Sequence, residues 1–215
     1  MAVGISSLPI ELRVLILRQL WNIGDLSAAI ESGPSLAEAF TNSGDTTVAK
    51  VLQNEIDSRL WPLAIIIWHI RTSRRKYVIF DGGDMWKVLQ DCHNTYDTSS
   101  AWEVLCCVGL SEANEHFHNL NQAVQYFTTD FLSRAGRYLS VGTCGELPIP
   151  TASEIYRVER SFYYLELFCL LWGSGKRMSA DWHLEVSRGL AIELDPWMNE
   201  QIACVRVCFK YQRNK

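Results

Sequence analysis

The sequence predicts an all-α fold in which a small three-helix N-terminal segment packs on an irregular helical domain. Two observations predict it. Apolar residues recur at spacings of three and four, most regularly over residues 112–132. Helix-start signals also precede several such stretches, including a Thr151-x-x-Glu154 capping box. Only residues 77–80 have a strand-like composition, so we expect one short strand or an extended connector there.

Length and composition limit the classes of protein that fit. A chain of 215 residues, 48% of them hydrophobic, can bury a core as one large or two small domains. Its net charge of -4 lacks the basic excess that nucleic-acid binding requires, so we expect no nucleic-acid partner. The longest apolar run, residues 60–70, contains Pro62 and His69 and is shorter than the roughly 20 residues of a spanning helix. We therefore expect a buried helix and no membrane span.

The cysteine content indicates the compartment. There are seven cysteines, an odd number, and their spacing does not suggest a disulfide framework. We expect most of them to be small buried hydrophobic residues in a reducing environment. The first residues also lack a cationic segment followed by an apolar stretch and a cleavage site. A cytoplasmic or nuclear location is therefore expected.

The first predicted helix, residues 9–21, is apolar on two sides. Pro9 suits a first helical turn, and Glu11 lies near the positive end of the helix dipole. One apolar stripe contains Leu8, Leu12, Ile16 and Leu20 with Leu15 beside them, and the other contains Ile10, Val14, Leu17 and Trp21. A helix that is apolar nearly all round must be covered on more than one side. The cover is either another protein or later helices of the same chain.

Further elements follow from local signals. Asp25 can cap a second helix that ends near Ile30, residues 32–34 break it, and a third helix begins at Ser35. A polar connection over 41–47 leads to an amphipathic stretch ending at Ile56. We therefore divide the chain into residues 1–45 and 46–215.

The C-terminal part has its own signals. Three glycines and two prolines in residues 136–150 indicate a long loop and an internal boundary. The helix that follows the capping box is predicted to reach Trp172. A last helix is predicted to begin at Asp195-Pro196 and to reach Phe209.

The first helix resembles an F-box. Leu8-Pro9, Glu11-Leu12, Ile16-Leu17 and Leu20 have the spacing of the pattern L-P-x-E-L-x-x-x-I-L-x-x-L, and Asp25-Leu26 follows near the expected second helix. The resemblance covers about residues 6–40. It implies docking on the Skp-type adaptor of a cullin ubiquitin ligase. The partner-binding residues that it implies are Leu8, Pro9, Leu12, Ile16, Leu17, Leu20 and Leu26.

A second resemblance concerns the rest of the chain. The motifs that carry it are Arg157, Glu159-Arg160, Phe162-Tyr163, Glu166-Leu167-Phe168, Pro196-Trp197, Glu200-Gln201 and Ala203-Cys204-Val205. They look like motifs of uncharacterised ascomycete proteins that also begin with an F-box-like segment. This implies a fungal source and no particular reaction.

Metal and catalytic sites are not expected. His116 and His118 lie about 200° apart around an α-helix, so they cannot share a metal ion. Cys204 and Cys208 share a face, but no second pair of ligands accompanies them. Cys106-Cys107 stands in an apolar stretch where a thiol stays protonated. We therefore predict no catalytic residue, no metal and no cofactor.

Three functions remain open. The leading hypothesis is a non-catalytic substrate receptor that binds a Skp-type adaptor and an unknown protein substrate. The second is a self-contained helical protein that acts through homo- or hetero-association. The third is an enzyme of unrecognised type, which a deep pocket would support if it held several of His93, Asp97, His116, Glu159 and His183.

Overall fold

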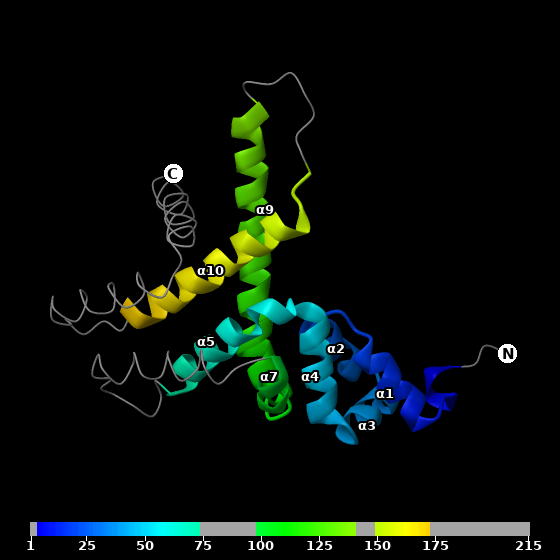
Figure 1. Cartoon of the computed structure of the whole chain (residues 1–215). Coiled ribbons are helices and arrows are strands. Elements are labelled where there is room, and N and C mark those ends of the chain that lie inside the picture. The colour runs from blue at the N-terminus through cyan, green and yellow to red at the C-terminus, as the bar shows by residue number, and fades with distance from the viewer. Residues whose placement is uncertain (1–3, 74–97, 141–148, 173–215) are drawn as a thin grey trace. The chain divides into compact units, whose positions relative to one another are not determined.

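The computed structural model describes residues 4–73, 98–140 and 149–172, and every regular element in these ranges is helical. The α-helices are α1 (Ile10–Arg18), α2 (Ile23–Glu31), α3 (Pro34–Thr41), α4 (Gly44–Glu55), α5 (Trp61–Ser73), α7 (Thr98–Leu105), α8 (Leu110–Glu112), α9 (Asn119–Ser140) and α10 (Ala152–Trp172). Two 3₁₀ turns, η1 (Ile5–Ser7) and η2 (Ser58–Leu60), and one π-helical segment, η3 (Ala113–His118), complete them. The predicted all-α fold class is confirmed for this part of the chain (Figure 1).

The first helix is shorter than predicted. Pro9 precedes its first residue, and the helix ends at Arg18, so Trp21 lies outside it. Gln19 closes the last turn because its backbone N–H donates to the carbonyls of Ile16 and Leu17. The chain then passes through a short turn into α2. The prediction that Trp21 continues the helical stripe of Ile10, Val14 and Leu17 is therefore wrong.

The starts of the next helices also differ from the prediction. Asn22, and not Asp25, caps α2, because its side-chain oxygen accepts a hydrogen bond from the backbone N–H of Asp25 at 2.8 Å. Pro34 occupies the first turn of α3, one residue before the predicted start at Ser35. Helix α4 begins at Gly44, so the connection predicted over residues 41–47 is only about two residues long.

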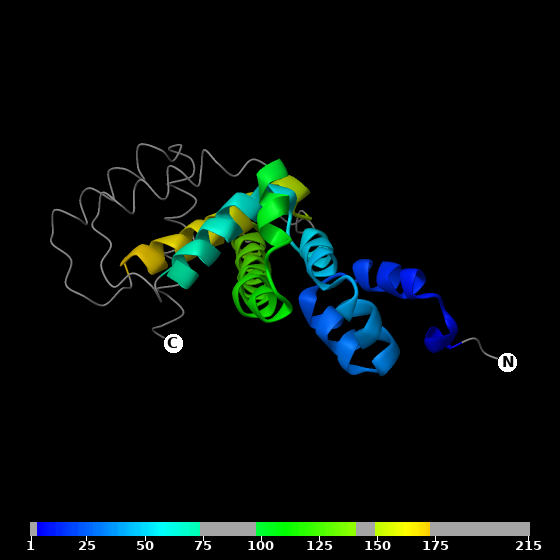
Figure 2. The ribbon, with the colours of Figure 1, turned by 90° about the horizontal axis from the view of Figure 1, so that it is seen from below.

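Residues 4–68 and 98–122 lie in the first of two compact units. Within it α1 packs on α3 and α4, α2 packs on α3, α4 and η3, and α4 packs on α7. Two perpendicular views show α1 to α4 grouped together (Figure 1, Figure 2). The fully buried side chains of α1, α2 and α4 include Leu17, Ile23, Leu26 and Leu52. Because α4 covers α1 and α2, this unit extends past the division that we drew after residue 45.

Helices α8, η3 and α9 form one continuous helix, from Leu110 to Ser140. This helix extends beyond the predicted range of 112–132 and includes Gly136. The loop that we predicted to begin at residue 136 therefore begins no earlier than residue 141. The wider π turn buries His116, Phe117 and His118 together. The Phe117 ring lies 6.0 Å from that of Trp68, between centroids.

The second compact unit contains the described residues 69–73, 123–140 and 149–172. Phe127 of α9 stacks on Phe162 of α10 with ring centroids 5.8 Å apart. Arg71 forms an ion pair with Glu166 at 2.7 Å. The predicted capping box is confirmed, because the Thr151 backbone N–H donates to Glu154 Oε2 at 2.8 Å and the Glu154 N–H donates to Thr151 Oγ1 at 3.2 Å.

Several predictions lie outside the described residues. They are the strand or connector at 77–80, the last helix at 195–209 and most of the predicted loop at 141–148. Within the described ranges, no helix is both long and apolar enough to cross a membrane.

Candidate protein-docking surface

Helix α1 turns one apolar stripe inward and leaves the other exposed. Leu17 is fully buried against α3 and α4, and Ile10 and Val14 are half-buried. On the opposite side, Leu12, Leu15 and Ile16 are 46%, 51% and 38% exposed. The core of this unit therefore accommodates only one of the two stripes.

Two arginines determine which way α1 faces. Arg13 points inward, with a side chain only 11% exposed. Its guanidinium Nη1 donates to the backbone carbonyl of Ser35 at 2.6 Å and to Glu38 Oε2 at 2.9 Å, both on α3. Five residues later, Arg18 Nη2 donates to Thr46 Oγ1 of α4 at 2.8 Å. Rotating α1 to bury Leu12 would break these bonds.

The C-terminal end of α1 is closed by a side chain of α4. The last carbonyls of a helix have no partner within it. Here the Asn54 amide nitrogen donates to the carbonyls of Arg18 and Leu20, both at 2.9 Å. This contact ends α1 and leads the chain into the turn that carries Trp21.

A buried polar pair anchors the beginning of α2. Glu55, the last residue of α4, accepts a hydrogen bond from the backbone N–H of Ile23 at 2.9 Å. Its other carboxylate oxygen lies 2.7 Å from His118 Nδ1, and the two side chains are only 4% and 7% exposed. Asn121 adds a hydrogen bond to the Glu55 backbone carbonyl at 3.1 Å. Helices α2, α4 and the π segment are thereby joined at one point.

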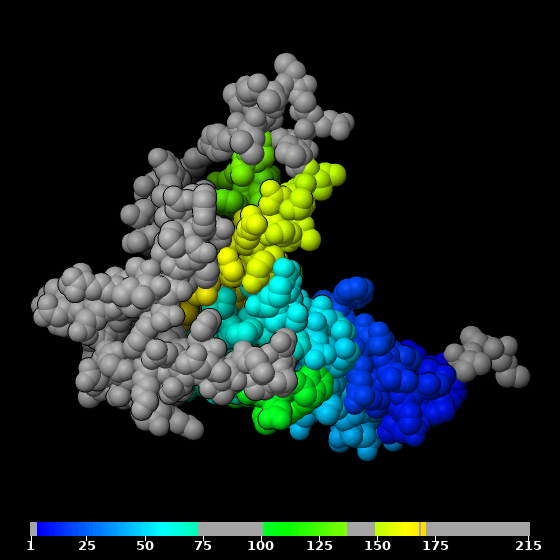
Figure 3. Space-filling view, in the orientation of Figure 1, coloured from blue at the N-terminus to red at the C-terminus, as the bar shows by residue number. Residues whose placement is uncertain are grey.

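These contacts leave a set of exposed apolar residues on α1 and on the segments that flank it, which we name the α1 surface. It consists of the exposed residues Ile5, Leu12, Leu15, Ile16 and Trp21, with the half-buried Leu8 and Leu20. In the described part of the chain, eight large hydrophobic residues are exposed, and five of them belong to this surface. Trp21 is 77% exposed. The space-filling view shows the blue N-terminal helices at the surface of their unit (Figure 3).

The structure places the seven residues implied by the F-box resemblance in two environments. Pro9, Leu12 and Ile16 are exposed, and Leu8 and Leu20 are half-buried. Leu17 and Leu26 are fully buried in the core and cannot touch a partner of the unit as folded.

The α1 surface also contains residues that the resemblance did not select. These are Ile5, Leu15 and Trp21. Helical spacing had placed Leu15 beside the stripe that contains Leu12 and Ile16. The exposure of Trp21 depends on where α1 ends, which no local signal showed.

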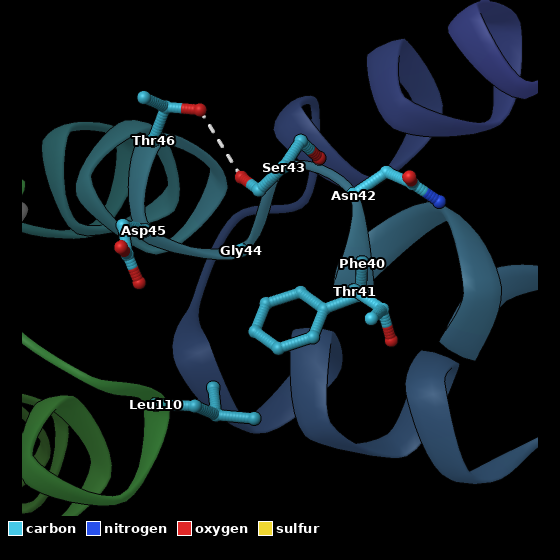
Figure 4. Close-up of a pocket in the computed structure, with 8 residues that line it drawn as sticks. All are labelled: Phe40, Thr41, Asn42, Ser43, Gly44, Asp45, Thr46 and Leu110. Carbon is cyan, nitrogen blue, oxygen red and sulfur yellow. Dashed lines mark hydrogen bonds between the residues drawn. The ribbon is translucent and has the colours of Figure 1, made fainter.

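A pocket of about 490 Å³ lies where α3 leads into α4. It is lined by Phe40, Thr41, Asn42, Ser43, Gly44, Asp45, Thr46 and Leu110 (Figure 4). Its polar donors are occupied within the chain: Thr41 Oγ1 donates to the Ala37 carbonyl, and Asn42 Nδ2 donates to the Glu38 carbonyl, both at 2.9 Å. The Thr46 hydroxyl likewise donates to the Ser43 carbonyl. The pocket thus presents a helix-to-helix junction and no set of convergent catalytic groups.

The candidate catalytic residues do not meet in this pocket. His93, Asp97 and His183 lie outside the described residues. His116 is buried in the first unit, and the half-buried Glu159 belongs to the second. Across the described ranges, no three His, Cys, Asp or Glu side chains are grouped so as to hold a metal ion.

The three cysteines in the described part of the chain are less buried than predicted. Cys107 and Cys169 are exposed and Cys106 is half-buried, while the other four lie outside the described residues. Cys107 is exposed because it follows the end of α7, in a turn where its thiol donates to the Glu103 carbonyl. Burial raises the pKa of the Cys106 thiol, and the neighbouring Cys107 and Asp45 add to this effect.

We therefore expect Cys107 to be alkylated before Cys106. At about pH 8 a thiol whose pKa is raised forms less of the reactive thiolate, and half-burial also limits access. A short pulse of iodoacetamide, with the labelled position located by fragment-ion mass spectrometry, should give Cys107 an initial rate about tenfold higher. Equal rates, or faster labelling of Cys106, would contradict this assignment.

The comparisons with known proteins identify no relative. No protein-family model, no curated protein and no solved structure is significantly similar to this chain.

Proposed function

We propose that the protein is a non-catalytic interaction module whose α1 surface docks on a Skp-type adaptor of a cullin ubiquitin ligase. The helical remainder would bind the protein to be ubiquitinated. The observation that carries the proposal is the exposure of Leu12, Leu15 and Ile16 on a helix whose opposite side is already buried. The F-box-like spacing of residues 8–20 suggests the class of partner, a Skp-type adaptor.

The energetic argument is independent of the resemblance. Burying a leucine or isoleucine side chain completely stabilises a protein by about 1.5 to 3 kcal/mol, so a half-exposed one forgoes about 1 kcal/mol. Trp21 is the most exposed residue of the α1 surface. Tryptophan is also among the residue types most enriched at positions that dominate the binding energy of interfaces. A partner that covers this surface recovers the free energy that the fold leaves unused.

The buried members of the predicted site take a structural role in this proposal. Leu17 and Leu26 hold α1 and α2 in the core, and the five remaining residues contact the adaptor. Arg13 and Arg18 keep the exposed stripe pointing outward.

The test is binding of the full chain to a purified Skp-type adaptor, compared between two matched variants. Ile16 is 38% exposed on α1, and Ile155 is 37% exposed on α10, so both isoleucines lose similar contacts when replaced. We expect Ile16→Asp to weaken binding about 30-fold or more, as a central interface residue does, and Ile155→Asp to leave it unchanged. Calorimetric titration measures both.

Two results would reject adaptor docking. One is the absence of binding by folded wild-type protein, and the other is an equal loss in both variants. The alternative, a self-contained association protein, makes a different prediction. Its α1 surface would be covered by another copy, so amides of residues 12–20 would exchange as slowly at working concentration as those of residues 119–124 and faster on dilution.

A further inference from the structure

The N-terminal segment exposes only negative charge. Residues 4–45 contain no lysine and only two arginines. Five carboxylates in the same range are all exposed, namely Glu11, Asp25, Glu31, Glu38 and Asp45. The formal charge of the segment is therefore -3, from five acids and two bases.

Both arginines are half-buried and make their polar contacts within the unit. Arg13 bonds to α3, and one of its two partners is Glu38, whose side chain stays 61% exposed. Arg18 bonds to Thr46. Arg13 offsets the charge of Glu38, so the rest of the segment, four acids and Arg18, carries a formal charge of -3.

Two of the carboxylates lie close in sequence to residues of the α1 surface. Glu11 immediately precedes Leu12 and stands one turn before Leu15, on the exposed side of α1. Asp25 accepts a hydrogen bond at 2.8 Å from Asn22, the residue that follows Trp21. One acid therefore accompanies Leu12 on α1, and another lies in the first turn of α2, shortly after Trp21.

We infer that the partner of the α1 surface presents an apolar groove bordered by lysine or arginine side chains. This inference rests on the proposed docking function and specifies the partner's chemistry. Complementary charges at the rim of an interface guide association and discriminate between partners. A second copy of the chain does not fit, because a twofold contact places the same patch on both sides and would bring acids near acids.

The test uses full-length protein and two synthetic amphipathic helical peptides. Both have leucine at the same positions on one face, and their polar faces carry either lysine or glutamate. We expect the lysine peptide to bind about tenfold more tightly at low salt, with the preference shrinking as salt approaches about 0.5 M. Fluorescence anisotropy of labelled peptides measures both affinities.

Two double variants separate specific docking from general attraction to an acidic protein. Glu11→Gln/Asp25→Asn keeps the apolar residues of the α1 surface and should lose most of the preference for lysine. Leu12→Ser/Ile16→Ser keeps every charge and should bind neither peptide well. Equal affinity of wild type for the two peptides would overturn the inference, as would a lysine preference that survives Leu12→Ser/Ile16→Ser.

The same preparations distinguish this inference from the ligase proposal. Wild type that binds the lysine peptide through the α1 surface but ignores the Skp-type adaptor would support the charge assignment and reject the ligase role. Adaptor binding with no preference between the peptides would support the ligase role and reject the charge assignment. Self-association of wild type through the α1 surface, seen by sedimentation and abolished in Leu12→Ser/Ile16→Ser, would overturn the inference.

Discussion

Replacing Glu55 with alanine is expected to lower the free energy of unfolding by about 3–5 kcal/mol. The carboxylate meets the backbone N–H of Ile23 and the ring of His118, and both it and the histidine are almost completely buried. Removing it leaves two buried polar groups without a partner, and each costs about 1–3 kcal/mol. Urea denaturation followed by circular dichroism measures the loss.

A residue on the same helix provides the control. Gln53 is half-buried on α4, and its side chain accepts a hydrogen bond only from Lys50, at 3.1 Å. Gln53→Ala should cost less than about 1 kcal/mol. If Glu55→Ala were no more destabilising than Gln53→Ala, the pair would not anchor α2, and the junction of α2, α4 and η3 would need another explanation.

Truncating Leu17 should cost about 2–5 kcal/mol, whereas truncating Leu15 should cost no more than about 1 kcal/mol. The two leucines are two positions apart on α1, and the substitution removes the same atoms from each. Leu17 is fully buried and Leu15 is 51% exposed. Comparing Leu17→Ala with Leu15→Ala by denaturation therefore measures the orientation of α1 directly.

The opposite order of effects would be informative. A larger loss in Leu15→Ala would mean that α1 buries its other stripe in solution. The α1 surface would then lose its physical basis, and the docking proposal would rest on sequence spacing alone. A further check is that Leu15→Ala, although only mildly destabilising, should weaken adaptor binding.

Local signals predicted the helices well because their causes are local. The Thr151–Glu154 capping box forms within one turn, and its two reciprocal hydrogen bonds need nothing else. Pro34 starts α3 by its own geometry, and the prediction missed this start by only one residue. The end of α1 could not be predicted in this way, because Asn54, more than 30 residues later, closes it.

The candidate site was predicted in part. The two-stripe character of the first helix was evident from spacing, but which stripe faces outward depends on partners of Arg13 and Arg18 that lie 22 and 28 residues away in the chain. The same limit applies to Leu17 and Leu26. The resemblance implies that they contact a partner, whereas the structure buries both in the core. The exposure of Cys107 depends on α7 ending just before it.

The inward arginines have a consequence for the uniqueness of the fold. Hydrophobic attraction is non-directional. A helix with two comparable apolar faces can therefore adopt two orientations about its axis that bury similar apolar areas. The guanidinium contacts with Ser35, Glu38 and Thr46 remove that degeneracy, since only one setting satisfies them. They act as a key that selects one orientation, much as a single polar residue can specify register in a coiled coil. Without these contacts, two orientations of α1 would have similar free energies and both would be populated.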